Sequence, residues 1–424
     1  MHDEQNVRVR VARRLRVLGP LRIGLLALLV AALVSVVVYR SWLDGQVRAA
    51  EVLSVTLKVP VLAWATRVVT DAPRARESVV AGVPTTVVRP GGGTHWPVLV
   101  FLNGVTARGR HQPDVERLAR ALARVGFLVL VPDPPGLARG EITEKTVAAT
   151  IAVVRAAADR PDARGGRVGL VGVSVGGSLA LLAGEDATLA GRVTIVAGIA
   201  PYTDLANVIR LATTGYILED GRLVSYTAQS FLPLVIARSL VAELPRSSDR
   251  RALLTELLRL PDDARDPLAL FRRLRPERLD PSVRALVELF ANRDPSRFDQ
   301  LYAALSPALR ASVERLSPLA GAARLRAPVE IASAPHDKYF PLEETRALAP
   351  AAGHTHVRLT VTSTLHHAIP SLSLSDIADL FRFDGWVVRT LQTARSRRSP
   401  SASLQGRGER AGSSGDSAIP VRTR

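Results

Sequence analysis

The sequence predicts an α/β protein with a mostly parallel central sheet, flanked by helices and interrupted once by a long helical insertion. Short apolar runs of strand type alternate with amphipathic stretches of helical period from residue 77 to residue 204, a pattern typical of a parallel sheet. Strand signals then disappear until residue 328 and return twice before a last helix. With 424 residues, 47% of them hydrophobic, the chain can hold this domain and a membrane segment.

The composition excludes some classes of function. The chain has no cysteine, so it forms neither disulfides nor thiolate metal sites. Its net charge of +17 comes almost entirely from arginine, and residues 1–22 and 394–424 carry +4 and +5 of it. Because no basic patch is interleaved with aromatic residues, we expect no nucleic-acid partner.

An apolar run near the N-terminus predicts a membrane anchor over residues 23–43. Residues 23–39 are uncharged, and six arginines precede them in a basic tail over residues 1–22. As a helix this run spans about 26 Å, so the flanking apolar residues are needed to cross a hydrocarbon core of about 30 Å. The positive charge before the run places the N-terminus in the cytoplasm and the following domain outside. A cleaved signal peptide is the alternative.

The segments next to the anchor and at the C-terminus are predicted to be irregular. Residues 44–76 are expected to form a juxtamembrane linker, whose apolar part over 52–69 lies on the bilayer or on the domain. If this part crossed the membrane instead, the domain would return to the cytoplasm. Residues 394–424 are rich in Ser, Gly and Arg and are predicted to be disordered.

The first half of the domain is predicted to begin with an antiparallel hairpin over residues 77–90. Buried strands are expected over 97–102 and 127–131, and each is followed by a helix. The first helix is closed by Gly126, and the second begins after Thr143. The residues predicted on the inner faces are Val115, Leu118, Leu122 and Val125 in the first helix and Val147, Ile151 and Val154 in the second.

The second half of the domain contains the insertion. Strands are expected over residues 167–171, 193–197, 328–334 and 357–361, and the last helix over 375–393. Residues 205–324 have amphipathic stretches rich in Leu and Arg and no strong strand signal, which indicates a helical cap. The core would then comprise residues 77–204 and 325–393.

A Gly-rich turn after the strand over 167–171 carries the chemical signal. Gly172-Val173-Ser174-Val175-Gly176 stands between that strand and a helix start. Small neighbours allow a sharp strand-to-helix turn that exposes the serine hydroxyl, and the helix N-terminus faces the same point. This context predicts a serine nucleophile at Ser174.

A serine hydroxyl needs a base, and the base needs an acid to orient it. Asp337 follows a late strand and is our predicted acid. His367 precedes the closing helix and is the predicted base, with His366 as the alternative. The remaining histidines come before the serine, adjoin the acid or enter the last strand; they are His2, His95, His111, His336, His354 and His356.

Two backbone N–H groups are expected to stabilise an oxyanion. One belongs to Val175, directly after the nucleophile. The other is assigned to Val105, in the loop after the first buried strand, where Gly104 allows close approach of the backbone.

Each of these signals also has a structural explanation. The Gly-rich motif can be an ordinary turn, Asp337 can cap the helix expected over residues 342–348, and the histidine pair can lie on the surface. A metal cluster of that pair with His354 and His356 lacks the helical spacing and the carboxylate that would support it. The placement of all three chemical roles at the carboxyl ends of strands, in one order, favours an active site.

On these motifs the chain resembles the α/β-hydrolase superfamily over residues 77–393. The resemblance rests on Asn103-Gly104, Gly172-x-Ser174-x-Gly176-Gly177, Asp337 with Pro341, and His367. It implies a central, mostly parallel sheet, an acyl-enzyme mechanism and no cofactor or metal. Many members have His-Gly where this chain has Asn-Gly, and the cap carries no recognised subfamily signature.

The sequence therefore predicts a membrane-anchored serine hydrolase that cleaves carboxylic esters, with a hydrophobic or lipid-like substrate. An acyltransferase is the chemically adjacent alternative, because an alcohol can replace water. A non-catalytic binding or scaffold protein of the same fold is the alternative from another class.

Overall fold

A computed structural model describes residues 29, 39, 44–56, 71–353, 355–367, 369–370 and 377–396, with the backbone alone for residues 366, 369, 370 and 377. The basic tail, almost all of the predicted anchor, the segment 57–70 and the C-terminal tail from residue 397 lie outside the described residues. Within the described part of the chain, no helix combines the length and apolar character that a bilayer crossing requires.

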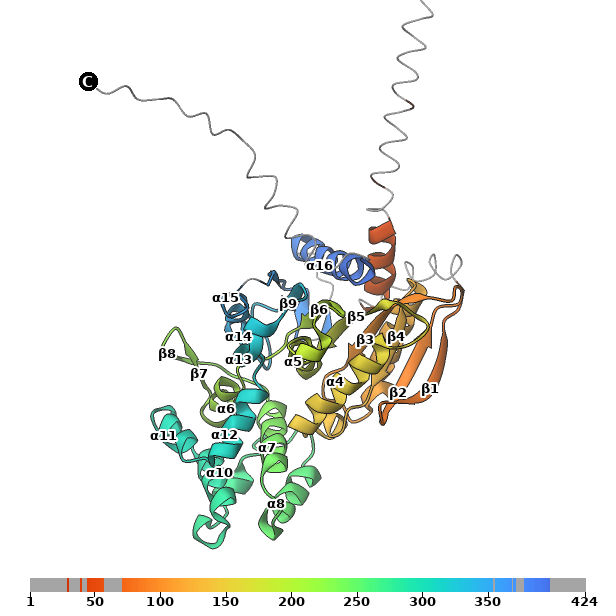
Figure 1. Ribbon diagram of the computed structural model, residues 1–424. Coiled ribbons are helices and arrows are strands. Elements are labelled where there is room, and N and C mark those ends of the chain that lie inside the picture. Colours follow the sequence, from red (N-terminus) through yellow and green to blue (C-terminus); the bar gives the residue numbers. More distant parts are fainter. Residues whose placement is uncertain are drawn as a thin grey trace, which may run out of the picture.

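The core is an eight-stranded sheet in the order β1-β2-β4-β3-β5-β6-β9-β10 (Figure 1). The strands β1, β2 and β4 pair antiparallel, and every other neighbouring pair is parallel, as the sequence predicts. The strands are β1 (Arg74–Val80), β2 (Val83–Arg89), β3 (Trp96–Leu102), β4 (Leu128–Pro132), β5 (Ala163–Val173), β6 (Val193–Ile199), β9 (Val329–Ser333) and β10 (Val357–Val361).

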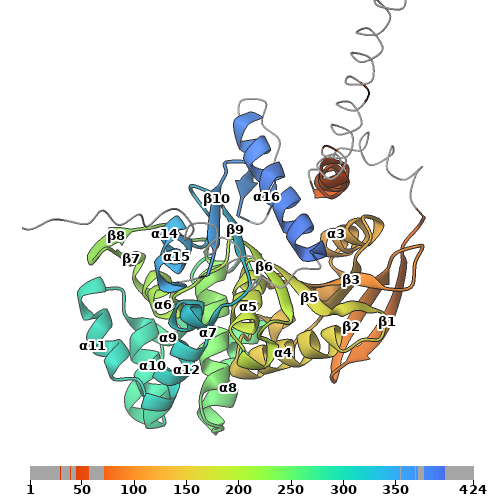
Figure 2. The same ribbon diagram turned by 45° about the horizontal axis from the view of Figure 1, so that its top comes forward.

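Helices cover both faces of the sheet, and each face has its own apolar cluster. One face packs against α4 and α5, and the other against α3, α16 and a helix over residues 44–56 (Figures 1 and 2). Central strands buried on both faces read as continuous apolar runs, which is why β3 and β4 were recognisable. The helices of the core are α3 (Pro113–Arg124), α4 (Glu144–Ala158), α5 (Val175–Gly184), α14 (Leu342–Arg346), α15 (Leu348–Ala351) and α16 (Ile377–Arg395).

The predicted inner face of α4 is partly wrong. Val154 is buried, but Val147 and Ile151 are only half-buried, and the buried stripe includes Thr146 and Thr150. These threonines tolerate burial because their hydroxyls donate to backbone carbonyls, Thr146 Oγ1 to Pro135 O at 2.7 Å and Thr150 Oγ1 to Thr146 O at 2.8 Å. A count of apolar residues alone does not reveal such a stripe.

The insertion between β6 and β9 is mainly helical, and it also contains a short hairpin for which the sequence analysis found no strong strand signal. β7 (Tyr216–Glu219) and β8 (Arg222–Ser225) form a hairpin whose two-residue turn is Asp220-Gly221, with φ of 47° and 76°. An Asp-Gly pair with both φ values positive is a strong hairpin signal that hydrophobic periodicity misses. The helices are α6 (Leu205–Thr214), α7 (Phe231–Glu243), α8 (Ser248–Arg259), α9 (Ala269–Arg272), α10 (Pro281–Ala291), α11 (Phe298–Ala303), α12 (Pro307–Arg315) and α13 (Pro318–Gly321).

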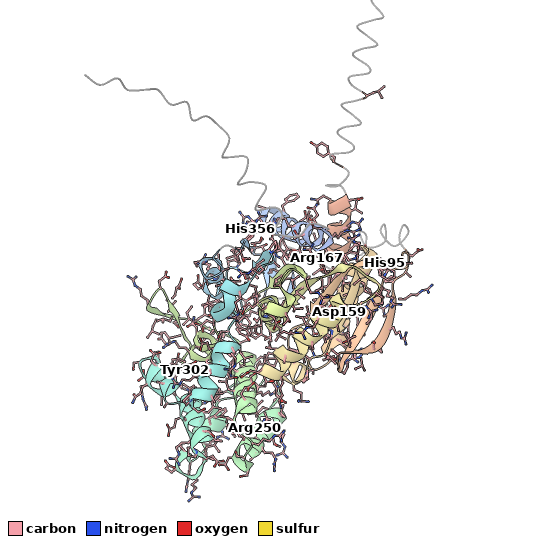
Figure 3. All side chains as sticks on the ribbon, in the orientation of Figure 1. His95, Asp159, Arg167, Arg250, Tyr302 and His356 are labelled. Atoms are coloured by element: carbon pink, nitrogen blue, oxygen red, sulfur yellow. The ribbon has the colours of Figure 1, made fainter. Side chains whose placement is uncertain are left out.

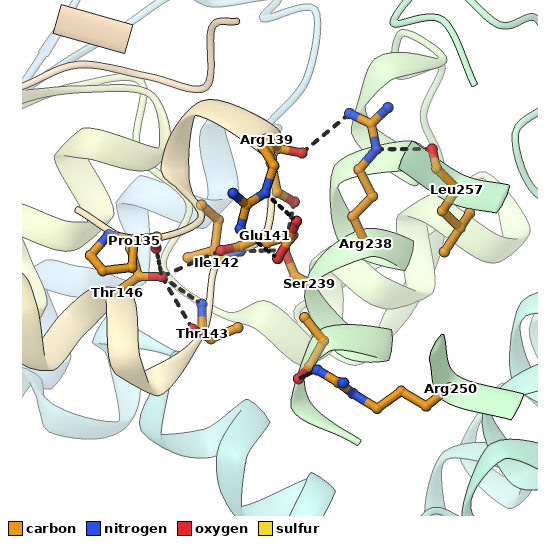
Figure 4. Close-up of polar contacts among 12 residues, drawn as sticks. Pro135, Arg139, Glu141, Ile142, Thr143, Thr146, Arg238, Ser239, Arg250 and Leu257 are labelled. Carbon is orange, nitrogen blue, oxygen red and sulfur yellow. Dashed lines mark hydrogen bonds and ion pairs between the residues drawn. The ribbon is translucent and has the colours of Figure 1, made fainter. Parts of the chain in front are cut away.

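Polar contacts attach α7 of this cap to the loop between β4 and α4 (Figure 4). The buried Arg238 guanidinium donates to the carbonyls of Arg139, at 3.3 Å, and Leu257, at 3.1 Å. Ser239 Oγ accepts from the Ile142 N–H at 2.9 Å. Because buried polar groups are costly without partners, these contacts fix one position of the cap on the core.

A buried carboxylate makes a second junction between core and cap. Glu344 Oε2 of α14 accepts from the N–H groups of Thr203 and Asp204 at 3.0 and 2.9 Å, and Glu344 Oε1 accepts from Asn207 Nδ2 at 3.0 Å. These partners lie where the chain enters α6. Burial raises the pKa of Glu344 to about 7.

We predict that Glu344→Gln weakens the dependence of stability on pH. An unfolded glutamate titrates near pH 4.3, so the folded protein binds more protons than the unfolded chain between about pH 4 and 7. The contribution of Glu344 to the free energy of unfolding therefore falls as pH rises through this range, by on the order of 3 kcal/mol. The midpoint temperature of thermal unfolding should be measured from pH 5 to 8 on the full-length protein in detergent. It should fall less with rising pH for the variant than for the wild type.

The half-buried Glu343, whose partner is Arg346, supplies the control for this measurement. Glu343→Gln removes a neighbouring carboxylate that is less buried, and it should change the pH profile less than Glu344→Gln does. A profile for Glu344→Gln parallel to that of the wild type would contradict the assignment of a raised pKa to this group.

Candidate active site

Ser174 lies on a strained turn between β5 and α5. Its φ of 55° and ψ of −129° are rare for a residue with a side chain. The flanking glycines make this turn possible, because a Cβ on Gly172 would lie 2.1 Å from Gly176 O, and a Cβ on Gly176 would lie 2.1 Å from Leu102 O. The predicted strand-to-helix turn is thus observed, with the serine at its apex.

Asp337 lies in the loop after β9, and its side chain is only 2% exposed. Its Oδ1 accepts from the N–H groups of Tyr339 and Phe340 at 2.8 and 3.0 Å. The hydroxyl of Tyr226, in the cap, donates to the Asp337 backbone carbonyl. Backbone donors stabilise a buried carboxylate and hold it in one orientation.

His367 joins the serine to the aspartate. Its Nε2 lies 3.0 Å from Ser174 Oγ, and its Nδ1 lies 2.8 and 2.9 Å from the two Asp337 oxygens. Because a carboxylate only accepts, Nδ1 carries the proton and Nε2 is left to accept from the serine hydroxyl. The structure thus brings the three predicted residues into one hydrogen-bonded chain, from positions 193 and 30 residues apart in sequence.

Aromatic rings hold the imidazole in place. The Tyr339 ring packs edge-on against His367 with a centroid distance of 4.5 Å, and the Phe340 ring lies 5.9 Å away. Sequence reasoning did not assign a role to these residues, nor to Tyr226. The one sequence signal for Tyr339 and Phe340 was their position two and three residues after Asp337, in the turn whose N–H groups bind the carboxylate.

Two other histidines with described side chains make contacts outside this chain of hydrogen bonds. His95 and His356 are labelled in Figure 3; His95 contacts Thr94, and the His356 carbonyl accepts from Val329 N at the start of β9. His354 lies outside the described residues, as does the side chain of His366, whose backbone belongs to the short strand β11 (Leu365–His366) paired with β12 (Ile369–Pro370). Among the described residues, no group of three or more His, Asp or Glu side chains is arranged to hold a metal ion.

A cavity of about 360 Å³ opens onto Ser174 and His367. Val105 and Val175, the predicted oxyanion donors, both line it. Val175 is the first residue of α5, so its N–H has no acceptor within the helix. Gly104 lies against the serine, since a Cβ there would be 3.3 Å from Ser174 Cβ.

The walls of this cavity are mainly apolar and come from segments far apart in the sequence. The cap contributes the start of α7, the core contributes the end of β3 and the start of α3, and the N-terminal helix over residues 44–56 contributes its last turn. The lining residues beyond those already named for the cavity are Val55, Thr56, Phe101, Asn103, Thr106, Gln112, Asp114, Val115, Leu118, Val173, Phe231, Leu232, Val235, Tyr339 and Phe340.

The chain belongs to the alpha/beta hydrolase family. A family model of that description matches residues 99–358, which is more than half of the chain. The match begins within β3, includes the Ser174 turn, the cap and Asp337, and ends before His367. No curated protein sequence matches the chain.

Solved structures with a similar fold include peptidases and a lipase. Dipeptidyl peptidase 4 from Porphyromonas gingivalis matches with 14% identity and a TM-score of 0.43 over 75% of this chain and 36% of its own. Acylaminoacyl peptidase from Pyrococcus horikoshii has 14% identity and a TM-score of 0.40, over 69% and 37%. A hormone-sensitive lipase from a metagenome library has 14% identity and a TM-score of 0.40, over 76% and 85%. The chain thus spans little more than a third of the two peptidases.

We predict that His367, and not His366, controls the reactivity of Ser174. Replacing His367 with Ala removes the proton acceptor 3.0 Å from the hydroxyl, and labelling by a fluorophosphonate should slow by about 100-fold or more. His366→Ala should have a much smaller effect. Labelling rates of the two variants, measured on folded protein, test this assignment, and equal losses in both would contradict it.

Proposed function

We propose that this member of the alpha/beta hydrolase family is a membrane-anchored serine hydrolase that cleaves carboxylic esters with an apolar acyl group. The observation that carries the proposal is the His367 imidazole, hydrogen-bonded to Ser174 on one side and to a buried aspartate on the other. This arrangement supplies the base that a neutral hydroxyl needs in order to attack a carbonyl.

The proposed reaction proceeds through an acyl-enzyme. Ser174 Oγ bonds to the acyl carbon while its proton passes to His367 Nε2, and Asp337 stabilises the imidazolium. The N–H groups of Val105 and Val175 hold the oxyanion. The carbon–oxygen bond to the leaving alcohol then breaks as His367 returns the proton, and water releases the acid by the same steps.

The cavity supports an apolar acyl group. Its walls carry Val, Leu and Phe side chains, and the described residues that line it include neither Lys nor Arg. Burial of apolar surface contributes about 25 cal/mol per Å², so such walls favour hydrocarbon over charged groups. A lipid-like ester has an apolar chain that fits the cavity walls and a carbonyl that the serine can attack.

The membrane anchor is proposed from the sequence. The uncharged run over residues 23–39 follows a tail with six arginines. An orientation with the N-terminus in the cytoplasm and the hydrolase domain outside follows from this asymmetry.

We predict Ser174-dependent ester hydrolysis. The purified full-length protein should hydrolyse p-nitrophenyl esters and react with a fluorophosphonate, and Ser174→Ala should abolish both, because the nucleophile is lost. Ser178→Ala is the matched control, since the Ser178 hydroxyl donates to Tyr202 O at 2.8 Å within the core. This control should retain activity and lose about 1 kcal/mol of stability.

Other outcomes separate the alternatives. Transfer of the acyl group to an added alcohol in preference to water would identify an acyltransferase. Absence of both labelling and hydrolysis in folded protein would identify a non-catalytic protein and overturn the proposal.

We predict that external protease digests the hydrolase domain in intact cells. An uncleaved anchor with its N-terminus in the cytoplasm exposes every residue after it to the outside. Immunoblotting of an N-terminal tag and of the domain, before and after protease treatment of intact and lysed cells, measures this. Protection of the domain in intact cells would rule out the external location.

A further inference from the structure

The helix over residues 44–56, which the sequence predicts as the start of a linker, is buried continuously over residues 51–54. Asp44 and Val47 in its first turn are exposed, whereas Ala49, Val52 and Leu53 are each less than a tenth exposed. In Figure 1 this helix, in red, runs beside α16. One side of the helix is therefore buried against the domain.

Specific contacts fix this helix to the core. Arg48 Nη1 donates to Val125 O, just after α3, at 2.6 Å, and Glu51 lies 3.8 Å from Arg124. Gly45 packs so closely against α16 that a Cβ there would lie 2.5 Å from Gln392 Nε2. Its buried residues belong to the apolar cluster that also contains residues of α3, β3 and α16. The helix is therefore part of the folded domain.

The last turn of the helix reaches the active-site cavity. Val55 and Thr56 line the cavity that contains Ser174, together with Val115 and Leu118 of α3. Both Val55 and Thr56 remain partly exposed although the preceding turn is buried. Both residues therefore contribute surface to the space that a substrate would fill.

We propose that this helix is a substrate-selecting wall, in which Val55 contacts the tail of a long-chain acyl ester. The inference rests on the proposed function and names its substrate class. The 13 residues of the helix measure about 20 Å and connect the predicted anchor directly to the cavity. An apolar side chain at this wall favours lipid esters with long chains over short soluble esters, because a longer chain buries more apolar surface.

The test compares chain lengths on the full-length protein in detergent. The measured quantity is the ratio of kcat/KM for p-nitrophenyl laurate to that for p-nitrophenyl acetate. Val55→Trp narrows the cavity at this wall. The ratio should then fall about tenfold, which is the scale expected for a changed apolar contact. Val55→Ala removes apolar contact with the acyl tail, so the ratio should also fall, by a smaller factor; this smaller change keeps the test valid if the tryptophan variant does not fold.

Val47→Trp is the matched control, because Val47 lies on the same helix and is 60% exposed. This control should leave the ratio unchanged. If the protein hydrolyses esters through Ser174 but neither Val55 variant alters the ratio, the substrate-selecting wall is overturned. The proposed function is then left intact. Absence of Ser174-dependent hydrolysis of both esters in the wild type would overturn both.

Discussion

The turn at Ser174 is the constraint on which the site depends. A residue with a side chain held at φ 55° costs on the order of 1–3 kcal/mol, so the surrounding structure has to enforce it. Ser174 N donates to Ile199 O at 2.7 Å, which ties the turn to the end of β6, and Gly177 N donates to Ser174 O at 2.8 Å. Because β5 is paired on both sides, the turn at its end holds the serine hydroxyl at the carboxyl edge of the sheet. The loops after β9 and β10 meet it there because these strands run parallel to β5.

The buried aspartate makes the cap part of the site. A carboxylate loses its hydration on burial, and Asp337 regains partners from two backbone N–H groups and the imidazole. The cap holds the loop that provides them, since Tyr226 donates to Asp337 O and Gln229 N donates to Lys338 O at 2.9 Å. Displacement of the cap would therefore loosen the acid, and through it the base.

The sequence was informative where local chemistry decides structure. The turn around Ser174 requires glycine on both sides, so the position of the serine could be predicted. Central strands buried on two faces are visible as apolar runs, so the order in which the motifs follow these strands could be predicted as well. The rule that parallel strands end at one edge led to Asp337 and to the pair His366 and His367, and the position of His367 at the turn into the closing helix favoured it over His366. Contacts that form between distant segments left no such trace. Nothing local indicates that Tyr226 reaches Asp337, or that Glu344 holds the entrance to α6.

The N-terminal helix over residues 44–56 also packs through contacts between distant segments, so the sequence did not reveal its docking on the domain. A short apolar stretch next to a predicted anchor has the same composition whether it lies on a bilayer or on the domain. Its burial is decided by the complementary surface between α3 and α16, which exists only after the sheet has formed. Once docked, the helix and the cap line one cavity from different parts of the chain, and their apolar side chains lie beside the partly exposed Ser174. In such surroundings the hydrogen bonds of His367 are stronger than in water, because the effective dielectric constant is lower. The apolar walls thus act on the reactive group as well as on whatever the cavity holds.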